Sequence, residues 1–125
     1  KLYALDSKTG AKKWEFKTDG PVFSSPTVSN GIVYTGSNDH KLYAIDAKTG
    51  AKKWESWTNS NVRSSPTVTD SVAYIGSLDG KLYAIDLQTG NKKWNFQTGG
   101  GIYSSSAVLN SAAKTYYAGV SGVQQ

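Results

Sequence analysis

The residues able to support catalysis are few in this chain, and their types restrict its chemistry. The chain has no cysteine and a single histidine, His40. It therefore has no thiolate nucleophile, no disulfide and no multi-histidine metal site. Asp39 and Asp79 stand in predicted turns without the further carboxylates of a calcium loop, so we interpret them as turn residues. Serine pairs recur along the chain without an adjacent base and are interpreted as structural; they lie at 24–25, 64–65 and 104–105.

Positions that vary between otherwise equivalent segments are the best candidates for ligand contacts. One such position holds Phe23, Arg63 and Tyr103, and another holds His40 where the next segment has Gly80. A cation, an imidazole and two aromatic rings could together hold a ligand. The candidate ligand face is therefore Phe23, His40, Arg63 and Tyr103. The alternative is neutral drift at loop tips, and no catalytic residue, metal ligand or cofactor-binding residue is predicted.

These variable positions lie within a repeat of 40 residues. Residues 21–60 align with residues 61–100 without a gap, and 22 of the 40 positions are identical. Such a fixed period is typical of repeat architectures. We divide the chain into a half unit at 1–19, full units at 20–59 and 60–99, and a degenerate half unit at 100–125.

Each full unit contains four short segments rich in β-forming residues and bounded by Gly, Asn, Asp or Ser. In the two units these segments are 24–28 and 64–68, 32–37 and 72–77, 41–46 and 81–86, and 52–56 and 92–96. Segment 42–45 is apolar at every position, which indicates a strand covered on both faces. Four strands per 40 residues predict the blade of a β-propeller. The fold class is thus all-β, with about three blades formed as four-stranded antiparallel meanders, in an incomplete propeller.

An eleven-residue motif, Ala-x-Asp-x-x-Thr-Gly-x-x-x-Trp, occurs three times in register. Its members are Ala4, Asp6, Thr9, Gly10 and Trp14, then Ala44, Asp46, Thr49, Gly50 and Trp54, then Ala84, Asp86, Thr89, Gly90 and Trp94. Asp46 and Thr49 can accept backbone N–H groups in the turn. Gly50 would supply the positive φ of a type I turn with a G1 bulge. We expect the tryptophans to pack between successive blades, and Ala44 to leave room for an indole ring.

This motif resembles the tryptophan-docking motif of the pyrroloquinoline-quinone (PQQ) repeat, or quinoprotein alcohol dehydrogenase-like, propellers. The resemblance covers nearly the whole chain. It implies either a non-catalytic scaffold or a protein- or ligand-binding module, or a fragment of a PQQ- and calcium-dependent alcohol or sugar dehydrogenase. Many alcohol-oxidising members use a vicinal disulfide, and all need a carboxylate base with calcium ligands; this chain offers neither. We therefore favour the non-catalytic alternative, without cofactor, and the resemblance suggests a periplasmic, outer-membrane-associated or extracellular location.

The net charge of +5 does not indicate a nucleic-acid partner. The lysines recur in register with the repeat, at 1, 41 and 81, at 12, 52 and 92, and at 13, 53 and 93. Charges that repeat with the structural unit favour a solvated face, and no aromatic platform alternates with them. Lysines on the fourth, outermost strand also discourage edge-to-edge pairing. No apolar run is long enough to span a bilayer.

The order of the predicted strands leaves the propeller open. The chain begins with a third and a fourth strand and ends with a first and a second strand, whereas closed propellers have four to eight whole blades. We expect other blades as partners, either in a homo-oligomer or from further parts of a longer chain. Near-identity of the units also permits a designed repeat array. The last segment is degenerate, with Ser106 where the full units have Pro26 and Pro66.

Overall fold

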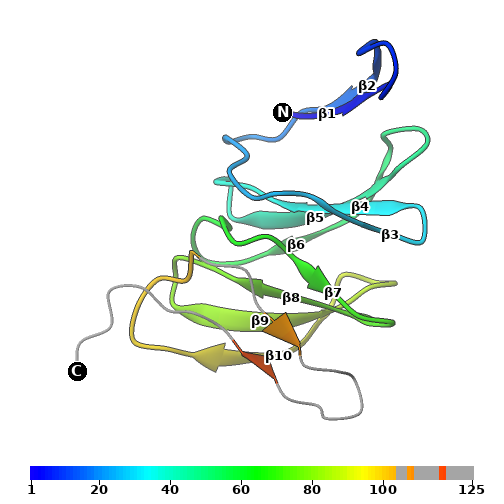
Figure 1. Ribbon diagram of the computed structural model, residues 1–125. Coiled ribbons are helices and arrows are strands. Elements are labelled where there is room, and N and C mark those ends of the chain that lie inside the picture. Colours follow the sequence, from blue (N-terminus) through cyan, green and yellow to red (C-terminus); the bar gives the residue numbers. More distant parts are fainter. Residues whose placement is uncertain (104–106, 109–115, 118–125) are drawn as a thin grey trace.

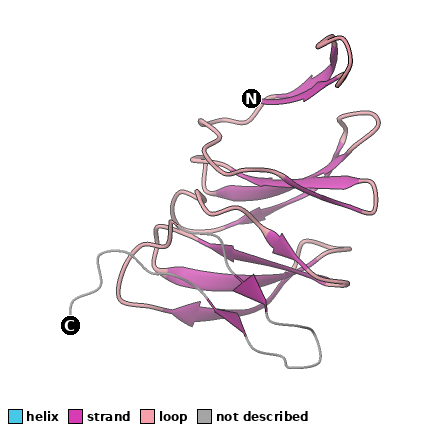
Figure 2. Ribbon diagram, in the orientation of Figure 1, coloured by secondary structure: helices cyan, strands magenta, loops and turns pink. Residues whose placement is uncertain are grey.

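The computed structural model describes residues 1–103, 107–108 and 116–117, and every regular element in that part of the chain is a β-strand (Figure 2). The strands are β1 (Leu2–Leu5), β2 (Lys12–Phe16), β3 (Thr27–Ser29), β4 (Ile32–Gly36), β5 (Lys41–Asp46), β6 (Lys52–Trp57), β7 (Thr67–Val68), β8 (Val72–Gly76), β9 (Lys81–Asp86), β10 (Lys92–Gln97), β11 (Ala107–Val108) and β12 (Tyr116–Tyr117). Within the described ranges no helix has the length and apolar character needed to cross a membrane.

The strands form antiparallel sheets in chain order. The two four-stranded sheets are β3-β4-β5-β6 and β7-β8-β9-β10, and two hairpins, β1-β2 and β11-β12, form separate two-stranded sheets. Figure 1 shows the sheets that contain β1, β5 and β9 stacked face to face, with β1-β2 at one end of the stack. The arrangement is open, which confirms the all-β, incomplete-propeller prediction.

The strand that was expected to be covered on both faces is covered. Every residue of 41–45 is buried, because alternate side chains pack against different neighbouring sheets. Leu42 and Ala44 belong to a cluster with Ala73 and Ile75 of the next sheet. On the opposite face, Tyr43 and Ile45 cluster with Leu2 and Val33, and Trp14 and Phe16 of the preceding hairpin pack against that cluster. Strand β5 is thus the centre of two inter-sheet cores.

The first strand of each sheet starts later than the sequence predicts. It was expected at 24–28 but begins at Thr27. Pro26 has no N–H to donate to a ladder, and the Ser24 Oγ accepts the Gly36 N–H at 2.8 Å in place of a backbone carbonyl. Ser64 accepts the Gly76 N–H in the same way, also at 2.8 Å. These two serines therefore tie the incoming chain to the sheet by side-chain bonds.

The hairpin turn has the glycine that the sequence predicts but not the predicted turn type. Gly50 has φ of +80°, and its N–H donates to the Asp46 carbonyl at 2.9 Å. That bond spans four residues, one more than a type I turn with a G1 bulge provides. The extra residue in the pairing is instead Lys53, since Ala44 faces Trp54 and Ile45 faces Lys52. The bulge thus lies inside strand β6.

The expectation for the end of the chain, a degenerate last segment with Ser106, lies outside the described residues. Strands β11 and β12 pair with Ala107 opposite Tyr117 and Val108 opposite Tyr116. In the preceding sheet Thr67 faces Tyr74 and Val68 faces Ala73. The β11-β12 hairpin therefore has the pairing pattern of β7-β8.

Candidate functional site

Each repeated tryptophan bonds to the turn of the following sheet. The Trp14 indole Nε1 donates to the Ala47 carbonyl at 2.9 Å, and Trp54 Nε1 donates to the Leu87 carbonyl at 2.8 Å. Both accepting residues directly follow the aspartate of the next motif. Asp46 Oδ1 shapes that turn by accepting the N–H groups of Lys48 at 2.8 Å and Thr49 at 3.0 Å. Because the N–H groups of Thr49 and then Lys48 stabilise the ionised carboxylate, they lower the pKa of Asp46.

A glycine in each turn allows the ring to approach closely. A Cβ added to Gly50 would lie 2.8 Å from Trp14 Cδ2, and one added to Gly90 would lie 2.7 Å from Trp54 Cε3. Either distance is shorter than a real Cβ contact, so these positions must be glycine for two reasons, the close ring and the positive φ. The alanine of each motif lies opposite the tryptophan of its own hairpin, as Ala44 does opposite Trp54.

The loops at the opposite end of the sheets form a surface that we call the rim. It consists of the loops at 37–40 and 77–80 and of the segments at 17–25, 57–65 and 97–103. Asp39 accepts the Lys41 N–H at 3.0 Å and also bonds the Tyr43 hydroxyl. Burial, and then the bond to Asp39, raise the pKa of Tyr43. In the next sheet Asp79 accepts a hydrogen bond from the Tyr83 hydroxyl at 2.5 Å. Because this bond occurs in both sheets, we interpret the Asp–Tyr pair as structural.

One sheet carries a charged cluster at its rim. The Lys41 side chain is nearly buried, and its Nζ lies 3.2 Å from Glu55 Oε2 and 3.9 Å from Asp19 Oδ2. The Trp57 ring covers the ammonium, with Nζ 4.3 Å from the ring centroid. Trp57 itself remains exposed. This cluster was missed by sequence reasoning, although the replacement of Lys17 and Gln97 by Trp57 at one repeat position was a signal.

The predicted ligand face is brought together only in part. Arg63 stacks on Phe23, with Cζ 4.7 Å from the ring centroid, and its Nε donates to Asn38 Oδ1 at 3.2 Å. This contact joins the rims of two successive sheets. His40 lies elsewhere: its carbonyl accepts the Thr58 N–H at 2.7 Å. Its φ of +78° is in the region that favours glycine, as at the equivalent Gly80.

Tyr103, the fourth predicted residue, is exposed. Among the described residues, no recorded contact joins it to Phe23, His40 or Arg63. Of the four predicted residues, the structure therefore brings together Phe23 and Arg63, with Asn38 as a further neighbour.

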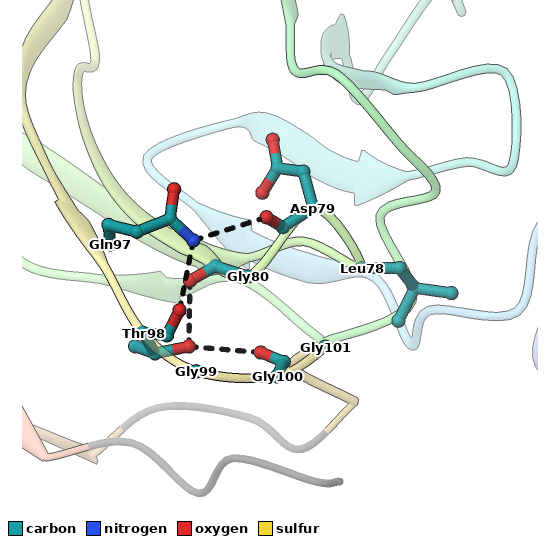
Figure 3. A pocket seen from close by; sticks show the side chains of 8 residues that line it. All are labelled: Leu78, Asp79, Gly80, Gln97, Thr98, Gly99, Gly100 and Gly101. Carbon is teal, nitrogen blue, oxygen red and sulfur yellow. Dashed lines mark hydrogen bonds between the residues drawn. The ribbon is translucent and has the colours of Figure 1, made fainter. Parts of the chain in front are cut away.

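A small hollow of about 130 Å³ lies at the rim of the second sheet. Figure 3 shows its lining residues, Leu78, Asp79, Gly80, Gln97, Thr98, Gly99, Gly100 and Gly101. The Gln97 Nε2 donates to the Asp79 carbonyl at 3.4 Å and to the Thr98 carbonyl at 2.9 Å, across this hollow. Two of its lining residues, Gly80 and Gln97, stand at the repeat positions of His40 and Trp57 in the first sheet.

Comparison with known families decides what this scaffold is. The sequence profile of the family described as outer membrane protein assembly factor BamB matches residues 1–108. The chain belongs to this family of PQQ-like repeat propellers. No curated protein matches the chain.

Solved structures agree with the family assignment. BamB from Moraxella catarrhalis superposes with a TM-score of 0.75 at 20% identity, over 89% of this chain and 34% of that one. The quinohemoprotein alcohol dehydrogenase ADHIIG from Pseudomonas putida HK5 gives 0.69 at 29% identity, over 75% and 17%. A europium-containing methanol dehydrogenase gives 0.66 at 23% identity, over 74% and 20%. The chain thus spans about a third or less of each of these relatives.

The described residues contain no group of three or more His, Asp or Glu residues that could hold a metal ion. Every buried side-chain nitrogen or oxygen in the described part already has a hydrogen-bond partner. In this part of the chain, a calcium ion would therefore find no cluster of carboxylate ligands.

Proposed function

We propose that this chain is a non-catalytic propeller segment that acts as a scaffold and protein-binding module. The observation that carries the proposal is the Phe23–Arg63–Asn38 cluster. Its residues differ from those at the equivalent positions of the repeat. The polar residues that do repeat form hydrogen bonds within turns and between blades. The family description, an assembly factor, supports a protein as the partner.

The scaffold role rests on the tryptophan contacts. Each indole is held by a hydrogen bond to the next turn, at 2.9 Å for Trp14 and 2.8 Å for Trp54, and it packs on a glycine. Burying such a ring stabilises by roughly 4–6 kcal/mol as an upper bound, since an aromatic side chain buries about 150–250 Å², and both rings pack against the inter-sheet cores. We infer that the motif joins blades and does not bind a quinone. The rims of successive blades are then held at fixed positions relative to each other.

The binding role rests on the chemistry of the cluster. Phe23 is exposed, and the Arg63 guanidinium is fixed over its ring by the bond to Asn38. Such an ordered arginine–aromatic platform loses little side-chain freedom on binding, and these residue types are enriched at protein interfaces. We place the partner on this platform and the protein in the periplasm or at the outer membrane.

Site-specific photocrosslinking tests this proposal. A photoreactive phenylalanine at position 23 is expected to capture a defined envelope protein, and the same group at Val28, exposed on strand β3, serves as the matched control. The captured partner is then purified, and its affinity is measured by calorimetry for the wild type, Arg63→Ala and Phe23→Ala. We expect each variant to bind about tenfold or more weakly. Equal affinity of all three chains, or equal capture from both positions, would contradict the rim site.

The alternative is a fragment of a PQQ-dependent dehydrogenase. It is supported by the 29% identity with the quinohemoprotein alcohol dehydrogenase over 75% of this chain. Titration with PQQ and CaCl₂, followed by quinone absorbance and the melting temperature, separates the two functions. The scaffold function predicts no saturable change in either signal, whereas saturation of both would favour the dehydrogenase.

A further inference from the structure

A hollow of about 370 Å³ lies between the two full sheets, at the end opposite to the rim. One wall comes from the β3-β4 turn and from strands β4 and β6 of the first sheet, and the other comes from the β7-β8 and β9-β10 turns of the second. Both walls belong to four-stranded sheets that the structure describes throughout. The volume is within the range of about 300–1,000 Å³ that is typical of small-ligand pockets.

The Tyr34 hydroxyl has no structural partner in this hollow. Tyr34 is only 3% exposed, and within the described residues its hydroxyl makes no hydrogen bond. Every fully enclosed side-chain nitrogen or oxygen in that part of the chain has a partner, so this hydroxyl must reach solvent. It does so at the hollow, which Tyr34 lines. The hydroxyls of Tyr43 and Tyr83, in contrast, bond to Asp39 and Asp79.

The Tyr34 ring has a separate, structural role. It belongs to the core between the two sheets and lies against Trp54, with the ring centroids 6.0 Å apart. A phenylalanine would provide the same packing. Burial raises the pKa of Tyr34, so the hydroxyl keeps its proton and can donate a hydrogen bond as well as accept one. The hydroxyl therefore offers binding chemistry that the scaffold does not require.

Four further polar side chains line the hollow. Lys53 lies at the bulge of β6, and such bulges often re-aim a side chain. Asn30 comes from the β3-β4 turn, and Asp70 and Gln88 come from turns of the second sheet. Among the described residues, none of these four side chains forms a hydrogen bond or an ion pair. Groups from two sheets thus meet at one hollow with their hydrogen-bonding capacity free.

The chemistry of these groups favours a neutral ligand rich in hydroxyls. The Lys53 ammonium donates, the Asp70 carboxylate accepts, and the amides of Asn30 and Gln88 do both. One positive and one negative charge leave no net attraction for an anion or a cation. The hydroxyls of a sugar both donate and accept, and their bonds to the two charged groups would be charge-assisted. The apolar face of a sugar ring could pack on Trp54, which is half-buried in the wall.

We propose that this inter-sheet hollow is a binding site for a neutral saccharide, with the Tyr34 hydroxyl at its base and Trp54 as its apolar wall. The site lies at the end of the sheets away from Phe23 and Arg63. It is therefore independent of the protein-binding role of the rim and adds a second kind of ligand. The saccharide is bound without any change to its covalent structure.

Titration of the 125-residue chain with neutral disaccharides tests the ligand class. The probes are maltose, cellobiose and diacetylchitobiose, and the comparison ligands are diglycine and inorganic phosphate, which carry charges. The chain has four tryptophans, and their indole N–H signals in a proton–nitrogen NMR spectrum report where a ligand binds. We expect a saturable shift of the Trp54 signal with at least one disaccharide, at roughly millimolar concentration. No saturable shift with any of them, or tighter binding of diglycine or phosphate, would overturn the proposal.

Tyr34→Phe separates binding from folding. It removes the hydroxyl and keeps the ring on Trp54, so we expect the melting temperature of the wild type and about tenfold weaker saccharide binding. Tyr43→Phe is the matched control, because it removes a hydroxyl that bonds to Asp39. It should lower the melting temperature and leave saccharide binding unchanged. Wild-type affinity in Tyr34→Phe, or an equal loss of affinity in Tyr43→Phe, would overturn the site.

Asp70→Asn tests whether the second sheet takes part. Asp70 is exposed and has no ion pair among the described residues, so stability should not change, whereas saccharide affinity should fall about fivefold. Asp19→Asn, at an exposed carboxylate on the rim, is the matched control and should bind as the wild type does. Equal affinity of the two variants would contradict a site formed between the two sheets.

Discussion

The two full sheets share the strand sequence KLYAID, yet their rims differ in charge and in shape. In the first sheet Lys41 is buried beside Glu55, Asp19 and the covering ring of Trp57. In the second sheet the equivalent Lys81 is only half-buried, and the positions of those three residues hold Asn95, Asn59 and Gln97. An identical strand thus begins beside an ion cluster in one sheet and beside a small open hollow in the other.

The motif contacts, in contrast, are reproduced between the sheets. The indole bonds of Trp14 and Trp54 differ by 0.1 Å, at 2.9 and 2.8 Å. Asp39 and Asp79 each hold a tyrosine hydroxyl. The comparison teaches that the repeat maintains blade packing, whereas the rim positions outside the motif are where the two blades acquire different properties. Five predictions test this division, in order of decreasing expected effect.

Removal of the enclosed indole should have the largest effect. Trp54→Ala loses the bond to Leu87, the packing on Gly90 and the contact with Tyr34. We expect the free energy of unfolding to fall by about 3–5 kcal/mol, as for other large-to-small core substitutions. Trp94→Ala is the matched variant, and its loss should be smaller because Trp94 is 44% exposed. Urea titration measures both, and equal losses would show that enclosure by the next blade does not matter.

A methyl group beneath the ring should come next. Gly50→Ala and Gly10→Ala occur at the same motif position and with similar φ, +80° and +75°. Only at Gly50 does a Cβ meet a ring, at 2.8 Å from Trp14 Cδ2, whereas nothing lies within 4 Å at Gly10. Both variants bear the cost of the left-handed conformation, so their difference isolates the ring contact. We expect Gly50→Ala to lose about 1–3 kcal/mol more in a urea titration. The opposite order would contradict the docking geometry.

Replacing the ion pair of the first sheet by the residue of the second should cost somewhat less. Glu55→Asn removes the carboxylate 3.2 Å from Lys41 Nζ and leaves a nearly buried ammonium less compensated. We expect a loss of about 1–2 kcal/mol at pH 7. Asn95→Glu in the second sheet is the matched control and should change stability little, since Lys81 is better solvated.

The same pair sets a pH dependence. Hydrogen bonding, first from Lys52 and then from Lys41, lowers the pKa of Glu55 from its ordinary value of 4.5. The stability that Glu55 contributes is therefore complete above pH 4.5 and is lost as the pH falls toward the lowered value of the folded protein. The stability difference between wild type and Glu55→Gln should shrink in that range, as measured by urea titration from pH 7 to pH 3. A difference that stays constant would show that the carboxylate is not paired in solution.

The covering ring should have the smallest effect. Trp57→Gln gives the first rim the residue of the second and removes a cation–π contact of 4.3 Å. Since Trp57 is exposed, we expect a loss of about 0.5–1 kcal/mol by urea titration. The reverse change, Gln97→Trp, should fill part of the hollow at Gly80 and should not destabilise the second sheet. A larger effect of Trp57→Gln than of Glu55→Asn would mean that the ring, not the ion pair, maintains the rim.

Much of the fold could be predicted from local pattern. The four strands per unit, the apolar third strand and the lysine-bearing outer strand depend on residue type and spacing along one segment. The late start of β3 could not be predicted, because it depends on Ser24 reaching Gly36 across the sheet. The turn that begins at Asp46 is one residue longer than predicted, and the extra residue in the strand pairing is Lys53. This register also depends on pairing across the sheet.

The candidate site was predicted less well. Phe23 and Arg63 were identified because they break the repeat, and they stack. Tyr103 breaks the repeat at the same position, but its neighbours among the described residues do not include that pair. His40 was selected for its chemistry, whereas its place in the structure is that of a glycine-like turn residue with φ of +78°. Residue type alone does not indicate whether a residue contributes its side-chain chemistry or its backbone conformation.

Local sequence accounts for the repeat, the presence of the strands and the positions of the turns, because those depend on backbone preferences and side-chain alternation within about ten residues. The burial of Lys41 but not of Lys81, and the stacking of Arg63 on Phe23, follow from the stacking of the sheets. Each of these depends on distances between residues 14 to 40 positions apart, which the packing within and between sheets sets. Identical segments acquire different chemistry because burial is a property of the neighbouring blade.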